Sequence, residues 1–367
     1  MEERLTIVNP GRLLPAHPGP DFSTASLGDG PPTKSTLMLE ESRWRPQCGL
    51  DTLRKRARLN AKIRAFFAAR DVLEVETPVM GACGVTDPLL HPFTTVFTLP
   101  GQRESRRLYL QTSPEFAMKR MLAAGSGSIY QITKAFRNDE VGRHHNPEFT
   151  LLEWYRVGFS LPDLMAEVES LIAELASGER DLLTPERLSY VDAFTLALGL
   201  HPLEAGFAEL ARVAEARGMP EAAELCGRDR PIWLDLLFSH WVQPGLGRRR
   251  LTSVYHYPAC LPSLARRCED DARFVERVEI FLEGVELGNG FHELADPREQ
   301  RQRFESDLEQ RRAMDLPEPA IDRRLLDALR VGLPDCSGIA IGLDRLLMAL
   351  IGGESLADAL AFPIERA

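Results

Sequence analysis

The sequence lacks paired cysteines of the kind that bind metals or staple small secreted domains. Its six cysteines are spread over 367 residues without a Cys-x-x-Cys pair. This pattern predicts reduced thiols, no structural metal site and a cytoplasmic location. No apolar run is long enough to span a membrane, and the N-terminus has no hydrophobic signal-peptide core, so we expect no membrane association.

An excess of positive charge is also absent. Asp and Glu number 54 against 44 Lys and Arg, which gives a formal charge of −10. A broad nucleic-acid surface is normally basic, so we expect no stable nucleic-acid partner, although a local basic site remains compatible with this charge. The glycine-rich phosphate motifs of the Rossmann and P-loop folds are missing, as is any Ser-His-Asp or Cys-His pattern.

The composition is that of a globular protein, with 44% hydrophobic and 27% charged residues. Residues 1–45 are rich in Pro, Gly and Ser and predict a disordered extension, in which Met38 is a candidate for the true start. Residues 46–367 form the predicted globular domain. Within it, about 161–243 reads as a mainly helical insertion.

Apolar spacing predicts a helix from Leu50 to about Arg70, followed by a short strand that ends at Pro78. Proline cannot donate to a sheet ladder, so this strand is expected at a sheet edge or subunit boundary. Ser113 is the expected N-cap of the next helix, with Pro114 at its first position. A hairpin is expected over 274–293 around Glu283-Gly284, then helices over 297–314 and 322–331.

The segment Ile129–Arg156 alternates in polarity at both ends and is charged in the middle. This pattern predicts two antiparallel strands joined by a basic loop. The loop offers Arg137 and Arg143, groups suited to a polyphosphate, although both also fit solvated hairpin charges. Period-2 geometry on the returning strand places four side chains on one face. They are Phe149, Leu151, Glu153 and Tyr155.

Two further segments carry candidate chemistry. Glu286 and Glu293 are seven residues apart, so an unbroken strand would point them to opposite faces, but Gly288 and Gly290 favour a bulge that re-aims one of them. Such carboxylates suit Mg²⁺ held on phosphates, and they also fit exposed strand acids. Gly338 to Arg345 allows close approach of a ligand to the backbone, or simply close helix–strand packing.

Together and in this order, the segments resemble the class II aminoacyl-tRNA synthetases. The strand ending at Pro78 resembles motif 1, Phe136-Arg137-Asn138-Asp139 with Phe149 resembles motif 2, and Gly338–Arg345 resembles motif 3. The stretches Thr112–Glu115, His145–Phe149 and Glu286–Glu293 are similar to the lysyl branch. The resemblance implies an α+β fold, an antiparallel sheet flanked by helices, and a homodimer.

A lysyl-tRNA synthetase carries an anticodon-binding domain of more than a hundred residues before its catalytic domain, whereas only about 45 residues precede the match here. The chain therefore resembles the truncated paralogues, the elongation factor P–(R)-β-lysine ligases. That resemblance implies ATP-dependent activation of lysine or (R)-β-lysine and its transfer to a lysine of elongation factor P. The alternatives are a trimmed synthetase that charges an RNA and a non-catalytic lysine or adenylate sensor.

The resemblance also implies residue roles, with ATP and Mg²⁺ as cofactors. Arg137 and Arg345 are implied as catalytic, and Glu286 and Glu293 as metal ligands. The implied ATP-binding residues are Arg137, Asn138, Asp139, Asn146, Phe149, Glu286, Leu287, Gly342 and Arg345. The implied substrate-binding residues are Ser113, Pro114, Glu115, Tyr155, Glu293 and Ala340.

Two positions depart from the synthetase pattern. Asp139 replaces the motif 2 glutamate, which shortens the acid by one methylene. Ala340 replaces a motif 3 glycine, and we take its methyl group as the pointer to β-lysine over α-lysine. On residue type alone, Glu115 fits a helix first-turn acid as well as a substrate ligand.

Overall fold

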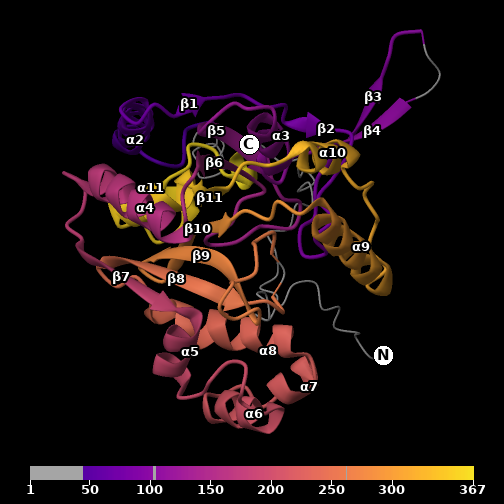
Figure 1. Ribbon diagram of the computed structural model, residues 1–367. Helices are drawn as coiled ribbons and strands as arrows, with labels where there is room; N and C mark the ends of the chain where they lie inside the picture. Colours follow the sequence, from indigo (N-terminus) through magenta and orange to yellow (C-terminus); the bar gives the residue numbers. More distant parts are fainter. Residues whose placement is uncertain (1–43, 102–104, 262) are drawn as a thin grey trace, which may run out of the picture.

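The computed structural model describes residues 44–101, 105–261 and 263–367. The predicted extension and Met38 therefore lie outside the described residues, apart from residues 44 and 45. An eight-stranded sheet runs through the molecule in the order β1-β5-β6-β11-β10-β9-β8-β7 (Figure 1). Its inner pairings are antiparallel, while β1–β5 and β7–β8 are parallel. The α+β prediction is confirmed.

The strands of this sheet come from the whole length of the chain. They are β1 (Leu73–Glu74), β5 (Ile129–Phe136), β6 (Glu148–Val157), β7 (Leu183–Ser189), β8 (Arg250–Pro258), β9 (Phe274–Leu282), β10 (Val285–His292) and β11 (Cys336–Gly342). The predicted strand before Pro78 is only β1, and it does lie at the edge. A second sheet, β2 (Met80–Gly81), β3 (Thr94–Thr98) and β4 (Ser105–Leu110), forms an arm that projects from the body (Figure 1).

Helices α2 (Leu50–Ala68), α4 (Leu161–Ala176) and α11 (Leu343–Ile351) supply most of the helical side chains of the main core, which they form with the sheet. The apolar face predicted for α2 is buried, including Ile63 and Phe67. On another part of the sheet α3 (Glu115–Ala123), α9 (Pro297–Ala313) and α10 (Arg323–Val331) enclose a smaller core. Helix α3 begins at Glu115, so the predicted N-terminus is off by one residue, although Ser113 Oγ still accepts from the Glu115 amide at 3.4 Å.

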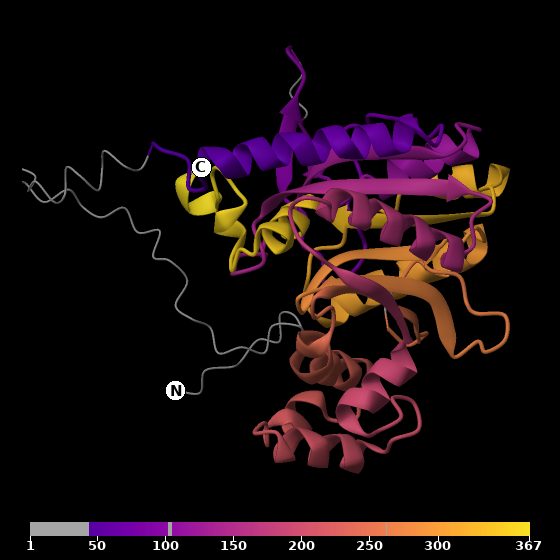
Figure 2. The ribbon, with the colours of Figure 1, turned by 90° about the vertical axis from the view of Figure 1, so that its left-hand side faces the viewer.

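The segment expected as a helical insertion divides between the sheet and a separate helical layer. Helix α4 belongs to the main core and β7 extends the sheet, whereas the residues after β7 form the helical layer. The helical layer lies below the sheet in Figure 2 and has its own core against β8 and β9. It contains α5 (Tyr190–Leu198), α6 (Phe207–Ala216), α7 (Ala222–Cys226) and α8 (Arg230–Leu237).

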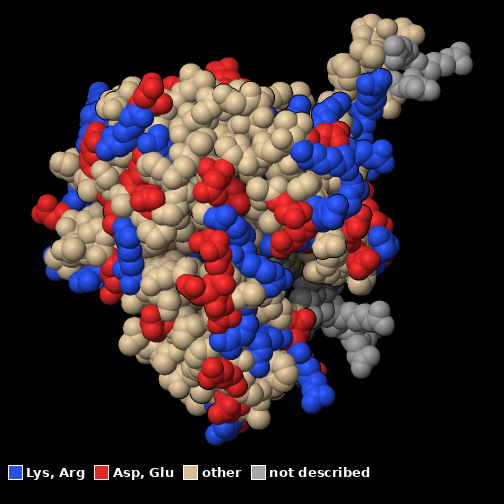
Figure 3. Space-filling view, viewed as in Figure 1, with Lys and Arg blue, Asp and Glu red and all other residues tan. Residues whose placement is uncertain are grey.

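Acidic and basic side chains are interspersed over the face seen in Figure 3, without one broad basic area on that face. Within the described parts of the chain, no helix has the length and apolar character needed to cross a membrane.

Candidate active site

A cavity of about 620 Å³ lies where β6, β10 and β11 meet α3 and the loop between β5 and β6. Most of the predicted site residues line it, from segments more than two hundred residues apart. They are Ser113, Pro114, Glu115, Arg137, Asn146, Phe149, Tyr155, Glu286, Leu287, Glu293, Ala340, Gly342 and Arg345. Asn138 and Asp139 are not among the lining residues.

Strand register explains how the two walls converge. The predicted β6 face lines the cavity with its whole set, Phe149, Leu151, Glu153 and Tyr155. On β10 the pairing with β9 shifts between Glu286 and Gly288, which is the predicted bulge. Because the bulge absorbs one residue, Glu286 and Glu293 both line the cavity despite their odd spacing.

Glycines allow close contacts of β11 with both neighbouring strands, β10 and β6. A Cβ on Gly288 would lie 2.5 Å from the Ala340 carbonyl oxygen, and one on Gly338 would lie 2.3 Å from the Tyr155 ring. Both distances are far below van der Waals contact, so these positions require glycine for packing rather than for backbone conformation.

Basic groups gather at one end of the cavity. The Arg137 guanidinium lies 5.1 Å from the Phe149 ring centroid, a cation–π arrangement. Arg345 donates from Nε to the His144 carbonyl and from an Nη to the Glu286 carbonyl, both at 3.0 Å. These contacts fix Arg345 across the gap between the β5–β6 loop and β10. We refer to this part, with Arg137, Phe149 and Arg345, as the basic end.

Glu140 is an acidic residue of the basic end that the sequence analysis missed. Its carboxylate accepts from Arg137 at 3.1 Å, and it lines the cavity. Burial opposes its ionisation, but the charges of Arg137, His145 and Arg345 outweigh burial and lower the pKa of Glu140. Asp139 instead lies 3.8 Å from His91. The acid that faces the cavity is thus one residue later than the motif 2 comparison placed it.

We expect Glu140→Ala to raise the KM for ATP about three- to tenfold, because Arg137 loses the carboxylate that orients it. Asp139→Asn should change this KM less than twofold, since its side chain does not line the cavity. ATP–pyrophosphate exchange at varied ATP measures both. A larger effect from the Asp139 variant would contradict the assignment.

Carboxylates gather at the other end, which we call the acidic end. Glu115, Glu153 and Glu293 lie here with the buried Lys119, whose ammonium is 2.6 Å from both Glu115 and Glu293. Burial would lower the pKa of Lys119, but the two carboxylates reverse the effect and raise it. Lys119 follows Glu115 by four residues, about one helical turn, and this spacing is the feature of the sequence that predicts their ion pair.

Two of these carboxylates, Glu153 and Glu293, have raised pKa values. Burial and the charge of Glu115 raise the pKa of Glu153 to about 8, and its Oε1 accepts from the Tyr155 hydroxyl at 2.7 Å. Burial raises the pKa of Glu293 to about 7 against the opposing charge of Lys119. One ammonium group, that of Lys119, thus faces three carboxylates. Such an excess of carboxylates favours a cationic ligand, because an added positive charge favours the ionised forms.

Asn146 lies at the basic end, but its side chain is engaged within the protein. Its amide nitrogen donates to the Glu148 carbonyl at 2.6 Å, and its oxygen accepts from the Ile364 amide at 3.0 Å. These bonds tie the β5–β6 loop to the C-terminal segment.

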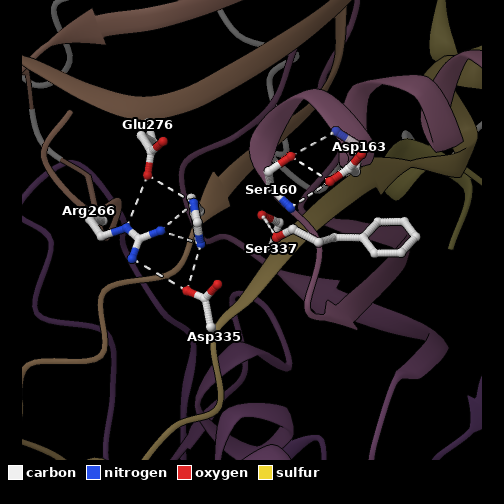
Figure 4. A network of polar contacts seen from close by, with 8 residues as sticks. Ser160, Asp163, Arg266, Glu276, Asp335 and Ser337 are labelled. Carbon is white, nitrogen blue, oxygen red and sulfur yellow. Dashed lines mark hydrogen bonds and ion pairs between the residues drawn. The ribbon is translucent and has the colours of Figure 1, made fainter. Parts of the chain in front are cut away.

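A network of hydrogen bonds and ion pairs holds the C-terminal end of β10, next to Glu293 (Figure 4). His292, next to Glu293, lies 2.9 Å from both Glu276 and Asp335, and Arg266 pairs with the same two acids. Beside it, Ser337 donates to the Phe159 carbonyl at 2.8 Å. Burial disfavours the charged imidazole, but the hydrogen bonds to Glu276 and Asp335 outweigh it and raise the pKa of His292.

Stability should therefore depend on pH through His292. A raised folded-state pKa contributes stability that is complete below the unfolded value near 6.5 and is lost as pH rises through the folded value. We expect the Tm of the protein to fall more between pH 6 and 8 than that of His292→Asn, measured by thermal unfolding. Equal pH slopes for the two proteins would contradict this role.

Comparison with known proteins decides the family. Residues 44–366 match the family model described as tRNA synthetases class II (D, K and N). The chain belongs to the class II tRNA synthetase family. The chain is also 48% identical over 330 residues to elongation factor P–(R)-beta-lysine ligases of Salmonella paratyphi B and Salmonella schwarzengrund. Each match covers 90% of this chain and 100% of the relative. The ligase of Salmonella dublin is equally similar. This synthetase-family chain thus spans the whole length of these ligases.

Proposed function

We propose that this protein activates (R)-β-lysine with ATP and transfers it to a lysine side chain of elongation factor P. The arrangement of the cavity carries the proposal, since a basic end suits a triphosphate and an acidic end suits a substrate with two ammonium groups. The names of relatives that match over their full length support the acceptor.

The first step joins the lysine carboxylate to ATP. A carboxylate oxygen attacks the α-phosphorus, the bond to the β-phosphate oxygen breaks, and pyrophosphate leaves. This chemistry needs positioning and charge neutralisation rather than a protein nucleophile. Arg137 would neutralise the α-phosphate, while Phe149 and Arg345 would flank the adenine. Glu115, Glu293 and Tyr155 would hold the two ammonium groups.

Of the two implied metal ligands, Glu286 fits Mg²⁺ better. Its carboxylate lines the cavity, is partly exposed and lies 4.0 Å from Arg345, whereas the buried Glu293 is paired with Lys119 at 2.6 Å. The described residues contain no group of three or more His, Cys, Asp or Glu placed to hold a metal. Mg²⁺ usually takes one or two carboxylates plus phosphate oxygens, so Glu286 would hold it together with ATP. When bound, the ion would neutralise charge on the pyrophosphate. The resemblance implies two roles for Glu293, metal binding and binding of a substrate amine. Because its carboxylate already binds the ammonium group of Lys119, we assign it to amine binding.

In the second step the neutral amine of the acceptor lysine attacks the adenylate carbonyl. The carbon–nitrogen bond forms, the bond to the phosphate oxygen breaks, and AMP leaves as the nitrogen loses a proton. Mass spectrometry of elongation factor P, incubated with this protein, Mg²⁺–ATP and either lysine isomer, tests the proposal. We expect the mass of one (R)-β-lysyl group on one lysine. An unmodified factor, with charging of an RNA instead, would overturn it.

Ala340 is the residue that we propose to set isomer preference. It lines the cavity on β11, where it pairs with Glu153 of β6. Ala340→Gly should shift relative kcat/KM toward α-lysine by about 5- to 150-fold, which corresponds to about 1–3 kcal/mol for one misfitted carbon. Pyrophosphate exchange with each isomer measures the ratio, and an unchanged ratio would count against the idea.

We also propose a cytoplasmic homodimer. The six cysteines are free, as in a reducing compartment. Apolar side chains exposed around β1 and β2, including Leu73 and Met80, are surfaces that a second copy could cover. Sedimentation analysis that found only monomer at micromolar concentration would exclude the dimer.

A further inference from the structure

A buried ion pair joins α2 to the first turn of α11, beside the basic end. Arg56 of α2 and Asp344 of α11 are in direct contact, and the Asp344 side chain is only 3% exposed. The second carboxylate oxygen of Asp344 accepts from the backbone N–H of Thr150 at 2.7 Å. Three elements therefore meet at one carboxylate: α2, β6 and α11.

The acceptor lies where the ladder between β6 and β11 stops. This pairing runs from Val157–Cys336 to Leu151–Gly342 and goes no further. Thr150, the next residue, still pairs with Lys134 of β5, and its N–H donates to Asp344. A buried N–H needs an acceptor, so the carboxylate continues the connection between β6 and α11 beyond the end of the sheet.

The residues next to Thr150 and Asp344 in the sequence connect this hydrogen bond to the proposed nucleotide site. Thr150 directly follows Phe149, and Asp344 directly precedes Arg345. The hydrogen bond thus links the side chain next to Arg345 to the backbone next to Phe149, the two proposed walls of the adenine site. A planar base held between a ring and a guanidinium tolerates little change in the gap, because stacking contacts fall off steeply with distance.

Arg56 holds the carboxylate in this position. It is not among the residues that line the cavity, so it acts on a ligand only through Asp344. A buried carboxylate without its cation is costly and would turn toward solvent. That change would weaken the bond to Thr150.

We infer that Arg56 and Asp344 are positioning residues for ATP, setting the gap between Phe149 and Arg345. The inference rests on the nucleotide site of the proposed function. It assigns a role in nucleotide affinity to α2, a helix that contributes no side chain to the cavity.

The test compares Arg56→Gln and Arg56→Lys with the unmodified protein. Arg56→Gln should raise the KM for ATP about 10- to 100-fold, since small misplacements of binding groups have effects of this size. The KM for the lysine substrate should change less than twofold, and Arg56→Lys should recover most of the ATP affinity. Calorimetric titration with ATP alone measures the affinity without any acceptor protein.

Glu167→Gln is the matched control. Glu167 is also a buried carboxylate, paired with Arg156 at 3.2 Å and bonded by Trp154, but it lies on α4 away from the cavity lining. It should lower the Tm without changing the KM for ATP. If Arg56→Gln does not fold, the neutral pair Arg56→Gln/Asp344→Asn takes its place. We expect the same selective rise in the KM for ATP, and an unchanged KM would overturn the inference.

Three outcomes would overturn the inference: unchanged ATP affinity in folded Arg56→Gln, an equal rise in both KM values, or an ATP effect of equal size in Glu167→Gln. Failure of the proposed function is separate. An unmodified protein that binds ATP but does not modify elongation factor P would contradict the function and leave the Arg56 comparison intact.

Discussion

Replacing Arg137 by alanine is expected to lower pyrophosphate exchange by about 100- to 1000-fold, the loss found when one preorganised donor to a developing negative charge is removed. Arg137 lines the basic end and is oriented by Glu140 at 3.1 Å and by the Phe149 ring. Its guanidinium would neutralise the α-phosphate as the new bond forms. The effect should fall mainly on kcat, because charge builds up in the transition state.

Arg143 provides a control from the same loop. Its side chain is 65% exposed, and its Nε donates to the Glu354 carbonyl. Arg143→Ala should retain exchange activity within about twofold, as expected for an exposed charge. Arg137→Lys keeps the charge without the planar fork and should be intermediate. Equal losses in both alanine variants would show that the loop needs positive charge in general.

Gly338→Ala should remove most lysine-dependent exchange. The added methyl carbon would lie 2.3 Å from the Tyr155 ring and 2.9 Å from Glu293 Oε1, so both side chains must move. Overpacking costs about 1–3 kcal/mol, and here it displaces two groups proposed to bind the substrate amines. We expect kcat/KM for lysine to fall about 5- to 150-fold, with a much smaller change in the KM for ATP.

Gly245→Ala tests whether any added methyl group would have this effect. No atom lies within 4 Å of its hypothetical Cβ, and its φ is not in the left-handed region. Its activity and Tm should match those of the unmodified protein. Retention of lysine-dependent exchange in Gly338→Ala would mean that β11 yields locally and that Tyr155 is not a fixed wall of the substrate site.

Hydrophobic periodicity in the sequence predicts much of the fold, because it shows which face of a strand or helix is buried. It predicts the helix at Leu50, the β5–β6 pair and the β9–β10 hairpin, and the structure confirms these elements. The same patterns say less about the region after Leu161. There β7 joins the sheet through parallel pairing with β8, about sixty residues later, which no local pattern records.

The sequence by itself determined the family, through several motifs in a fixed order. It also determined the cavity-facing side of β6 and the bulge that lets Glu286 and Glu293 share a cavity, since each of these depends on residue order along one strand. Only the tertiary structure decided which charges meet. Lys119 pairs with Glu293 from another element, Glu140 rather than Asp139 faces the basic end, and Arg56 reaches Asp344 across 288 residues. The physical reason is that electrostatic energy depends on separation in space and on burial, and neither is written in the spacing of residues along the chain.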